Sequence, residues 1–143
     1  MSNLLSVKVR STNQRMGYEA TVADRPPLAI DYIPPRGDLN GYLPMELILI
    51  SLASCTGSGI AFLLRKRGKT VIGLTVEATG DRSETHPTVF KSIVLDIAVE
   101  SPDVEPEELQ AVLKLAEGSV CPVYIMLKAS VAISVNSRIL EPV

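Results

Sequence analysis

The sequence contains few of the residues with which proteins bind nucleic acids. Tryptophan is absent, and aromatic side chains make up only 4% of the 143 residues, so aromatic platforms for stacking bases are not expected. The formal net charge is −2, and the longest basic cluster is Arg65-Lys66-Arg67 with Lys69 nearby. A nucleic-acid-binding domain would present a larger basic patch. We therefore expect no nucleic-acid partner.

Histidine and cysteine are also scarce, which bears on metal binding. His86 is the only histidine, and Cys55 and Cys121 are the only cysteines. The two cysteines are far apart in the sequence and form neither a Cys-x-x-Cys motif nor a tight metal-binding spacing. We expect no metal site and no bound cofactor. His86 precedes Pro87 and is assigned to a connection between two strands, either exposed or hydrogen-bonded.

The N-terminal residues lack the pattern of a secretion signal. Residues 1–8 contain no charged segment followed by an apolar one, which is how such signals are built. Free cysteines suit a reducing cytosol, where thiols stay available for chemistry. We therefore expect a cytoplasmic location.

One long apolar segment dominates the chain. Between Tyr42 and Leu64 the only charged residue is Glu46, and a segment of this length could span a bilayer. Hydroxyl side chains and two glycines, Gly57 and Gly59, interrupt it, so we favour a buried core helix and expect no membrane association. Each glycine costs about 1 kcal/mol relative to alanine in a helix, which indicates the close approach of another backbone or a small cavity beside Cys55. Apolar residues make up 46% of the chain, an excess that favours a large oligomer interface.

Local patterns predict a single α+β domain over residues 1–143. A turn at residues 11–17 joins two extended segments into a hairpin. Pro44 suits the first turn of the apolar helix, and Gly68 suits its end. Acidic residues from Glu105 to Glu108 favour the start of a second helix. The expected strands cover residues 4–10, 18–22, 28–33, 71–79, 89–99 and 131–135.

The two cysteines have different local settings. Cys55 lies in a run of small residues, where it is either a small apolar residue in a tight helix crossing or a residue beside a cavity. Cys121 directly precedes Pro122, which marks either a kink in the preceding helix or the first position of a new one. In the second case Cys121 is the N-cap, where the helix dipole stabilises a thiolate. If the two thiols meet in the fold, they form a redox couple.

Two motifs around the cysteines can be compared with known families. They are Pro44-Met45-Glu46-Leu47 followed by Ser51-Leu52-Ala53-Ser54-Cys55-Thr56, and Ala116-Glu117-Gly118-Ser119-Val120-Cys121-Pro122-Val123. Both resemble the cysteine motifs of the OsmC/Ohr family of thiol-dependent hydroperoxide reductases. Residues 82–90 are similar to the segment between its two central strands, and the element order agrees along nearly the whole chain. The resemblance implies an OsmC-like fold, in which antiparallel sheets wrap around two central helices of an intertwined homodimer.

The resemblance also implies a chemistry. Cys55 would attack a peroxide and become a sulfenic acid, and Cys121 would resolve it by forming a disulfide. An external dithiol reductant would then reduce the disulfide. Organic hydroperoxides are the implied substrates, with hydrogen peroxide as a further candidate. The helix dipole alone would make Cys121 the more activated thiol, and we follow the family in assigning the attack to Cys55.

Arg15 and Glu46 are the remaining candidate site residues. Arg15, in the first hairpin, is similar in place to the family's arginine that keeps the attacking thiol ionised; the alternative is a solvated turn residue. The family has a glutamate directly after the helix-opening proline, whereas this sequence has Met45 there and Glu46 one position later. Glu46 lies about 180° around the helix from Cys55, so it would reach a site only from the partner chain. This order resembles a less characterised OsmC-like branch, and Tyr124 replaces a small hydroxyl residue, which would narrow the pocket.

Three functions are compatible with these features. The first is a cofactor-free thiol peroxidase. The second is a binding module whose interface cavity holds a small apolar ligand, with incidental cysteines. The third is a structural or membrane-associated helix protein. Joint loss of both thiols after peroxide treatment distinguishes the enzyme from the binding module.

Overall fold

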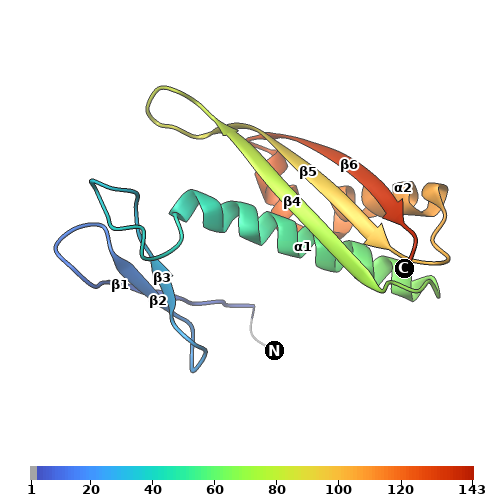
Figure 1. The fold of residues 1–143 in the computed structure, drawn as a ribbon, viewed down its shortest axis with the longest axis horizontal. Coiled ribbons are helices and arrows are strands. Elements are labelled where there is room, and N and C mark those ends of the chain that lie inside the picture. Colours follow the sequence, from blue (N-terminus) through green and yellow to red (C-terminus); the bar gives the residue numbers. More distant parts are fainter. Residues whose placement is uncertain (1–2) are drawn as a thin grey trace. The chain divides into compact units, whose positions relative to one another are not determined.

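The computed structural model describes residues 3–143 and has the α+β architecture that the sequence predicts (Figure 1). Two compact units are present, one ending at Ile48 and the other comprising Leu49–Val143. Helix α1 runs across the boundary between them, and a single domain over the whole chain stays a prediction. The elements are β1 (Lys8–Ser11), β2 (Tyr18–Thr21), β3 (Leu28–Ile30), α1 (Pro44–Lys66), β4 (Gly73–Arg82), β5 (Phe90–Glu100), α2 (Pro106–Leu115), the π-helical turn η1 (Ala116–Val120), α3 (Pro122–Lys128) and β6 (Ala132–Leu140).

The first unit contains the predicted hairpin and a third strand. Strands β1, β2 and β3 form an antiparallel sheet in that order. The register aligns Val9, Ala20 and Leu28 across the three strands, so one face of the sheet is apolar. Val9 is 51% exposed and Leu28 36% exposed. This apolar face therefore lacks a complete cover within the described chain.

The connection from β3 to α1 is organised by a buried carboxylate. Asp31 is 2% exposed and accepts hydrogen bonds from the backbone N–H groups of Tyr32, Asp38 and Asn40. These bonds, led by those of Tyr32 and Asn40, hold the pKa of Asp31 below its ordinary value against the opposing effect of burial. Gly37 lies directly against Asp31 and the Tyr32 backbone, where no larger residue would fit.

Helix α1 begins and ends where the local signals predict. Pro44 is its first residue, and the Glu46 carboxylate accepts a hydrogen bond from the Leu43 backbone N–H at 2.8 Å, which satisfies one of the free donors at the helix start. The helix stops before Gly68, which has a φ of +80°. Glycine adopts this left-handed conformation at no steric cost.

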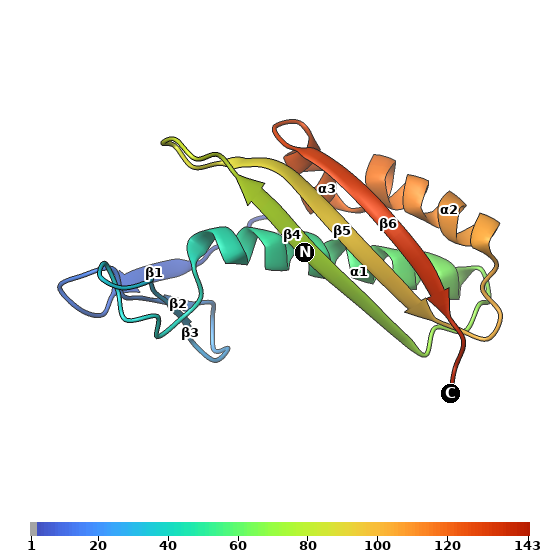
Figure 2. The ribbon, with the colours of Figure 1, turned by 45° about the horizontal axis from the view of Figure 1, so that its top comes forward.

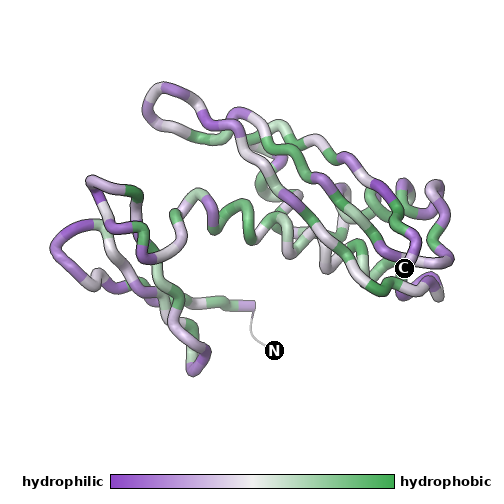
Figure 3. The backbone as a smooth tube through the Cα atoms, in the orientation of Figure 1, coloured by the Kyte–Doolittle hydropathy of each residue, from purple (hydrophilic) through white to green (hydrophobic). Residues whose placement is uncertain are grey.

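Helix α1 is apolar along most of its length (Figure 3). By length and composition it is long and apolar enough to cross a membrane, and 28% of its most apolar window is buried inside the chain. Its fully buried side chains are Leu52, Thr56, Ile60 and Leu64. One side of α1 therefore packs in the core of the second unit, while apolar side chains on its other side are exposed.

The second unit is built on a mixed sheet. Strands β4, β5 and β6 lie in that order, with β4 and β5 antiparallel. The expectation of antiparallel sheets is wrong for β6, which pairs with β5 in parallel. A parallel pair needs a long crossover connection, usually helical. Helices α2 and α3 with the turn η1 supply it, since they lie between β5 and β6 in the chain.

The core of the second unit lies between this sheet and the helices. Views from two directions show α1 and α2 against the same face of the sheet (Figures 1 and 2). A β-carbon added to Gly57 would lie 3.1 Å from side-chain atoms of both Leu74 and Val76 on β4. The atoms that closely approach Gly57 are therefore side-chain atoms of β4, and not the backbone that was one of the two expected alternatives. The fully buried core side chains include Leu52, Ile60, Leu64, Ile93, Leu95, Ile97, Val99 and Val112.

All six expected strands have boundaries that differ from those predicted: β1 begins only at Lys8, β4 continues to Arg82, β2 and β5 differ by one residue at one or both ends, and the ends of β3 and β6 have clear physical reasons. Strand β3 ends at Ile30, because Asp31 turns its carboxylate to the backbone of the following loop. Strand β6 continues to Leu140, well beyond the expected end at residue 135. Its polar residues Asn136 and Arg138 occupy the exposed positions of the alternation while the backbone stays paired to β5.

Candidate functional site

Cys121 is the N-cap of helix α3. The π-helical turn η1 ends the preceding helical segment, and Cys121 takes an extended conformation with φ −88° and ψ 105°. Pro122 then occupies the first turn of α3, and the Tyr124 backbone N–H donates a hydrogen bond to the Cys121 sulfur at 3.4 Å. Of the two alternatives left by the sequence, the new helix start is therefore confirmed.

Thr56 of α1 also contacts the Cys121 sulfur. Its Oγ1 lies 3.5 Å from Cys121 Sγ, and either atom can be the donor. Both residues are only 1% exposed. The contact joins two segments that are distant in sequence, the middle of α1 and the first residue before α3.

Cys55 precedes Thr56 on α1 and is half-buried. Burial is the largest cause that raises the pKa of its thiol, and a side-chain hydrogen bond with Cys121 raises that pKa further. A hydrogen bond from the Val123 backbone N–H acts in the opposite direction. The fold thus places the two cysteines near each other, because Cys121 Sγ contacts Thr56, the residue directly after Cys55, and the first turn of α3 lies beside both.

Tyr124 lies beside this pair and is 5% exposed. Its pKa is raised mainly by burial, and the negative charges of Glu117 and of a Cys121 thiolate add to the effect. The phenol is therefore neutral over the ordinary pH range. Tyr124 contributes a backbone hydrogen bond and a large buried ring to the site.

Arg15 lies in the first unit and has several partners there. Its guanidinium forms an ion pair with Asp38 at 2.6 Å and donates hydrogen bonds to the backbone oxygens of Pro35 and Gly37. The side chain is 43% exposed. Arg15 is thus held in a defined loop structure, and its place beside Cys55 stays a prediction.

Glu46 uses its carboxylate at the start of α1. One oxygen accepts the hydrogen bond from Leu43, and the residue is exposed. Met45 follows Pro44 directly, as the sequence shows. A role for Glu46 in the site of a partner chain stays a prediction.

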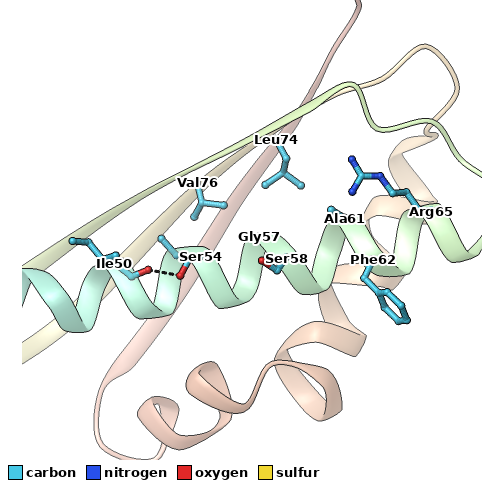
Figure 4. A pocket seen from close by; sticks show the side chains of 10 residues that line it. Ile50, Ser54, Gly57, Ser58, Ala61, Phe62, Arg65, Leu74 and Val76 are labelled. Carbon is cyan, nitrogen blue, oxygen red and sulfur yellow. Dashed lines mark hydrogen bonds between the residues drawn. The ribbon is translucent and has the colours of Figure 1, made fainter. Parts of the chain in front are cut away.

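An open groove of about 720 Å³ runs along another side of α1. Leu74 and Val76 of β4 form one wall, and Arg65 lies near one end (Figure 4). Arg65 donates a hydrogen bond to the Val71 backbone oxygen at 3.1 Å. Neither cysteine lines this groove. The lining residues are Ile50, Ala53, Ser54, Gly57, Ser58, Ala61, Phe62, Arg65, Leu74 and Val76.

Metal ligands do not gather at any of these positions. Within residues 3–143, no group of three or more His, Cys, Asp or Glu side chains is arranged to hold a metal ion. His86 is exposed in the connection between β4 and β5. An exposed position in a strand connection was one of the two alternatives expected for it.

Comparison with protein families places this geometry in a known context. A family model described as OsmC-like protein matches residues 37–136, which include both cysteines. The chain belongs to the OsmC-like protein family. A comparison with curated proteins found no match.

Solved structures share the OsmC-like fold along nearly the whole chain. A hypothetical protein of Aquifex aeolicus VF5 is 22% identical with a TM-score of 0.85, covering 99% of this chain and 100% of that one. An OsmC-like protein from Mycoplasma pneumoniae is 20% identical with a TM-score of 0.84, covering 98% and 99%. An organic hydroperoxide resistance protein OsmC from Legionella pneumophila is 16% identical with a TM-score of 0.69, covering 95% and 98%. The OsmC-like fold predicted from the sequence is confirmed.

Sequence reasoning missed one side chain of this OsmC-like site. Thr56 stood inside the first cysteine motif but was assigned no role. The signal available was a hydroxyl within an apolar helix, which must find a hydrogen-bond partner if it is buried. The identity of that partner, Cys121, depends on how α3 packs against α1 and is not encoded in local spacing.

Proposed function

We propose that this OsmC-like protein reduces organic hydroperoxides through the pair Cys55 and Cys121. The observation that carries the proposal is that the Cys121 sulfur lies 3.5 Å from the hydroxyl of Thr56, the residue directly after Cys55, so that the two cysteines are neighbours in the fold. The likeness to a protein named for organic hydroperoxide resistance supports the substrate class. No resident cofactor is required, because thiol chemistry supplies both electrons.

The proposed reaction has two steps at the cysteines. The Cys55 thiolate attacks one peroxide oxygen, the O–O bond breaks, and the products are a Cys55 sulfenic acid and an alkoxide that takes up a proton to become the alcohol. The Cys121 thiolate then attacks the Cys55 sulfur and displaces hydroxide, which leaves as water after protonation. An external dithiol reduces the resulting disulfide by exchange and restores both thiols.

The first step needs a further source of positive charge. Burial and Cys121 raise the pKa of Cys55, whereas the attacking species is the thiolate. Arg15 is proposed to supply that charge in the assembled protein, since a cation beside a thiol favours its ionised form. Its ion pair with Asp38 and its two backbone contacts would hold the guanidinium in one orientation.

The active assembly is proposed to be a homodimer. Ile50 and Phe62 on α1 are 48% and 61% exposed, and both line the open groove. The first sheet also leaves Val9 and Leu28 uncovered on its apolar face. Exposed apolar surface of this kind is typical of protein–protein interaction sites, and a second copy of the chain would cover these side chains. Glu46 of a partner chain could reach the site only in such an assembly.

A second candidate function rests on the groove. Its walls are mainly apolar, it has one cation near an end, and it contains neither cysteine. These features fit the binding of a small apolar ligand, with the thiols playing no part. The two candidate functions make opposite predictions for the thiols.

Thiol titration with cumene hydroperoxide separates these functions. The protein is reduced, freed of reductant and treated with one equivalent of the peroxide. The enzyme predicts that both free thiols disappear together and that the mass falls by two hydrogens, with no oxygen retained. Two intact thiols after treatment would refute the peroxidase and leave the binding function.

A further inference from the structure

The hydroxyl of Thr56 differs from its neighbours in how it is satisfied. A serine or threonine hydroxyl inside a helix commonly bonds a backbone oxygen one turn earlier, and Ser54 does so with Ile50 at 2.8 Å. Thr56 is instead directed out of its own helix, with Oγ1 at 3.5 Å from the Cys121 sulfur. The residue is 1% exposed, so water does not compete for this contact.

The Cys121 sulfur therefore has two hydrogen-bonding partners of different character. The Tyr124 backbone N–H can only donate, and it reaches the sulfur at 3.4 Å. The Thr56 hydroxyl can rotate to donate or to accept. It can accept from the Cys121 S–H while the thiol is protonated, and it can donate to the sulfur once the proton has left. A valine at this position would keep the branched shape and lose both capacities.

We propose that Thr56 is a positioning residue for the resolving step. It holds the Cys121 sulfur beside Cys55 and donates a hydrogen bond to the thiolate that attacks. In that step the Cys121 sulfur forms a bond to the Cys55 sulfur, the S–O bond of the sulfenic acid breaks, and the proton released by Cys121 ends on the departing hydroxide as water. The inference rests on the proposed function for the identity of the group displaced from Cys55.

A peroxide-independent assay isolates the attack by Cys121. One equivalent of dithiobis(nitrobenzoate) per protein first labels the more exposed thiol, Cys55, as a mixed disulfide and releases one coloured thionitrobenzoate. The Cys121 thiolate then attacks the Cys55 sulfur, the mixed disulfide bond breaks, and the second thionitrobenzoate leaves; the single reagent molecule is the two-electron oxidant, and no peroxide is needed. The Cys121→Ser variant, which should release only the first equivalent, identifies the two phases.

Three variants test the role of the hydroxyl. Thr56→Val should slow the second phase about tenfold at neutral pH and move its pH profile to higher pH, which is the size expected for one hydrogen bond to a charged group. Thr56→Ser keeps the hydroxyl and should restore the wild-type rate and profile. Ser119→Ala is the matched control, because the Ser119 hydroxyl bonds the Leu115 backbone oxygen at 3.1 Å and should leave the second phase unchanged.

The outcomes separate this inference from the proposed function. An unchanged second phase in Thr56→Val, or equal slowing in Thr56→Ser, would overturn the role of the hydroxyl. A wild-type protein that releases only one equivalent would also overturn it, because Cys121 would then not reach Cys55. If thionitrobenzoate is released in the second phase at the expected rates, but the thiols do not react with cumene hydroperoxide, the peroxidase function is refuted while the positioning role of Thr56 is supported.

Discussion

Two glycines on helix α1 allow the packing of the second unit to be tested quantitatively. Replacing a glycine in a helix interior by alanine is worth about 1 kcal/mol of stability when the new methyl group fits. A β-carbon at Gly59 would lie 3.6 Å from the nearest Val120 side-chain atom, which is an ordinary van der Waals contact. Gly59→Ala should therefore stabilise the protein by about 1 kcal/mol, or about 2–4 °C in Tm.

Gly57 should respond differently to the same change. A β-carbon there would lie 3.1 Å from both Leu74 and Val76, so the side chains of β4 must move. The cost of such crowding, about 1–3 kcal/mol for added groups in a packed core, opposes the gain in helix propensity. Gly57→Ala should thus be less stable than Gly59→Ala by about 1 kcal/mol or more, and Gly57→Val should be destabilising outright.

The measurement is denaturant unfolding of the three variants beside the wild type at one protein concentration, because a dimer's stability depends on concentration. Equal stabilisation by Gly57→Ala and Gly59→Ala would refute the close approach of β4 to α1. Destabilisation by Gly59→Ala would refute the packing assigned to the turn before Cys121.

Three further predictions concern charge and assembly. Backbone hydrogen bonds, from Thr70 to Asp103 and from Glu105 to Glu108, are the largest causes that hold the pKa values of the Asp103 and Glu108 carboxyls below their ordinary values. The stability that these bonds contribute is present above the ordinary carboxyl pKa and is lost as pH falls through the lowered values, so Tm should drop at acidic pH. Asp103→Asn should flatten this pH dependence of Tm, and an identical Tm profile in the variant would contradict the assignment. Arg15→Ala should raise the pKa of Cys55 and slow its alkylation at neutral pH while leaving Cys121 largely unaffected, and an unchanged pH profile of Cys55 labelling would make Arg15 an ordinary turn residue. Sedimentation at micromolar concentration should find a homodimer. A monomer would contradict both the proposal that a second copy covers the exposed side of α1 and the proposal of a site shared between chains.

The parts of the fold that local chemistry controls could be predicted from the sequence. Pro44 and Gly68 delimit α1 through their own backbone preferences, and the alternation in residues 89–99 identifies the most buried strand. The parallel pairing of β6 could not be predicted, because strand direction depends on where the helices after β5 return the chain. The end of β6 was missed for a related reason, since polar Asn136 and Arg138 are stabilised in a strand by pairing with β5 and not by their own propensity.

The same division applies to the candidate site. Cys55 and Cys121 stand out as the only thiols, and Pro122 reduces the settings of Cys121 to two. Choosing between them required the geometry of the π-helical turn that ends at Val120. The contact of Thr56 with Cys121 could not be predicted from the sequence, because it depends on the packing of two helices whose residues are far apart in the chain.

The central claim is that Cys55 attacks the peroxide and Cys121 captures the product, and intact-mass measurement of the two single-cysteine variants tests it most directly. After treatment with cumene hydroperoxide, Cys121→Ser should gain oxygen on Cys55, first as sulfenic and then as sulfinic acid, because no thiol remains to resolve it. Cys55→Ser should gain no oxygen on Cys121. Oxygen on Cys121 in Cys55→Ser, with none on Cys55 in Cys121→Ser, would contradict the account and assign the attack to the thiol at the start of α3.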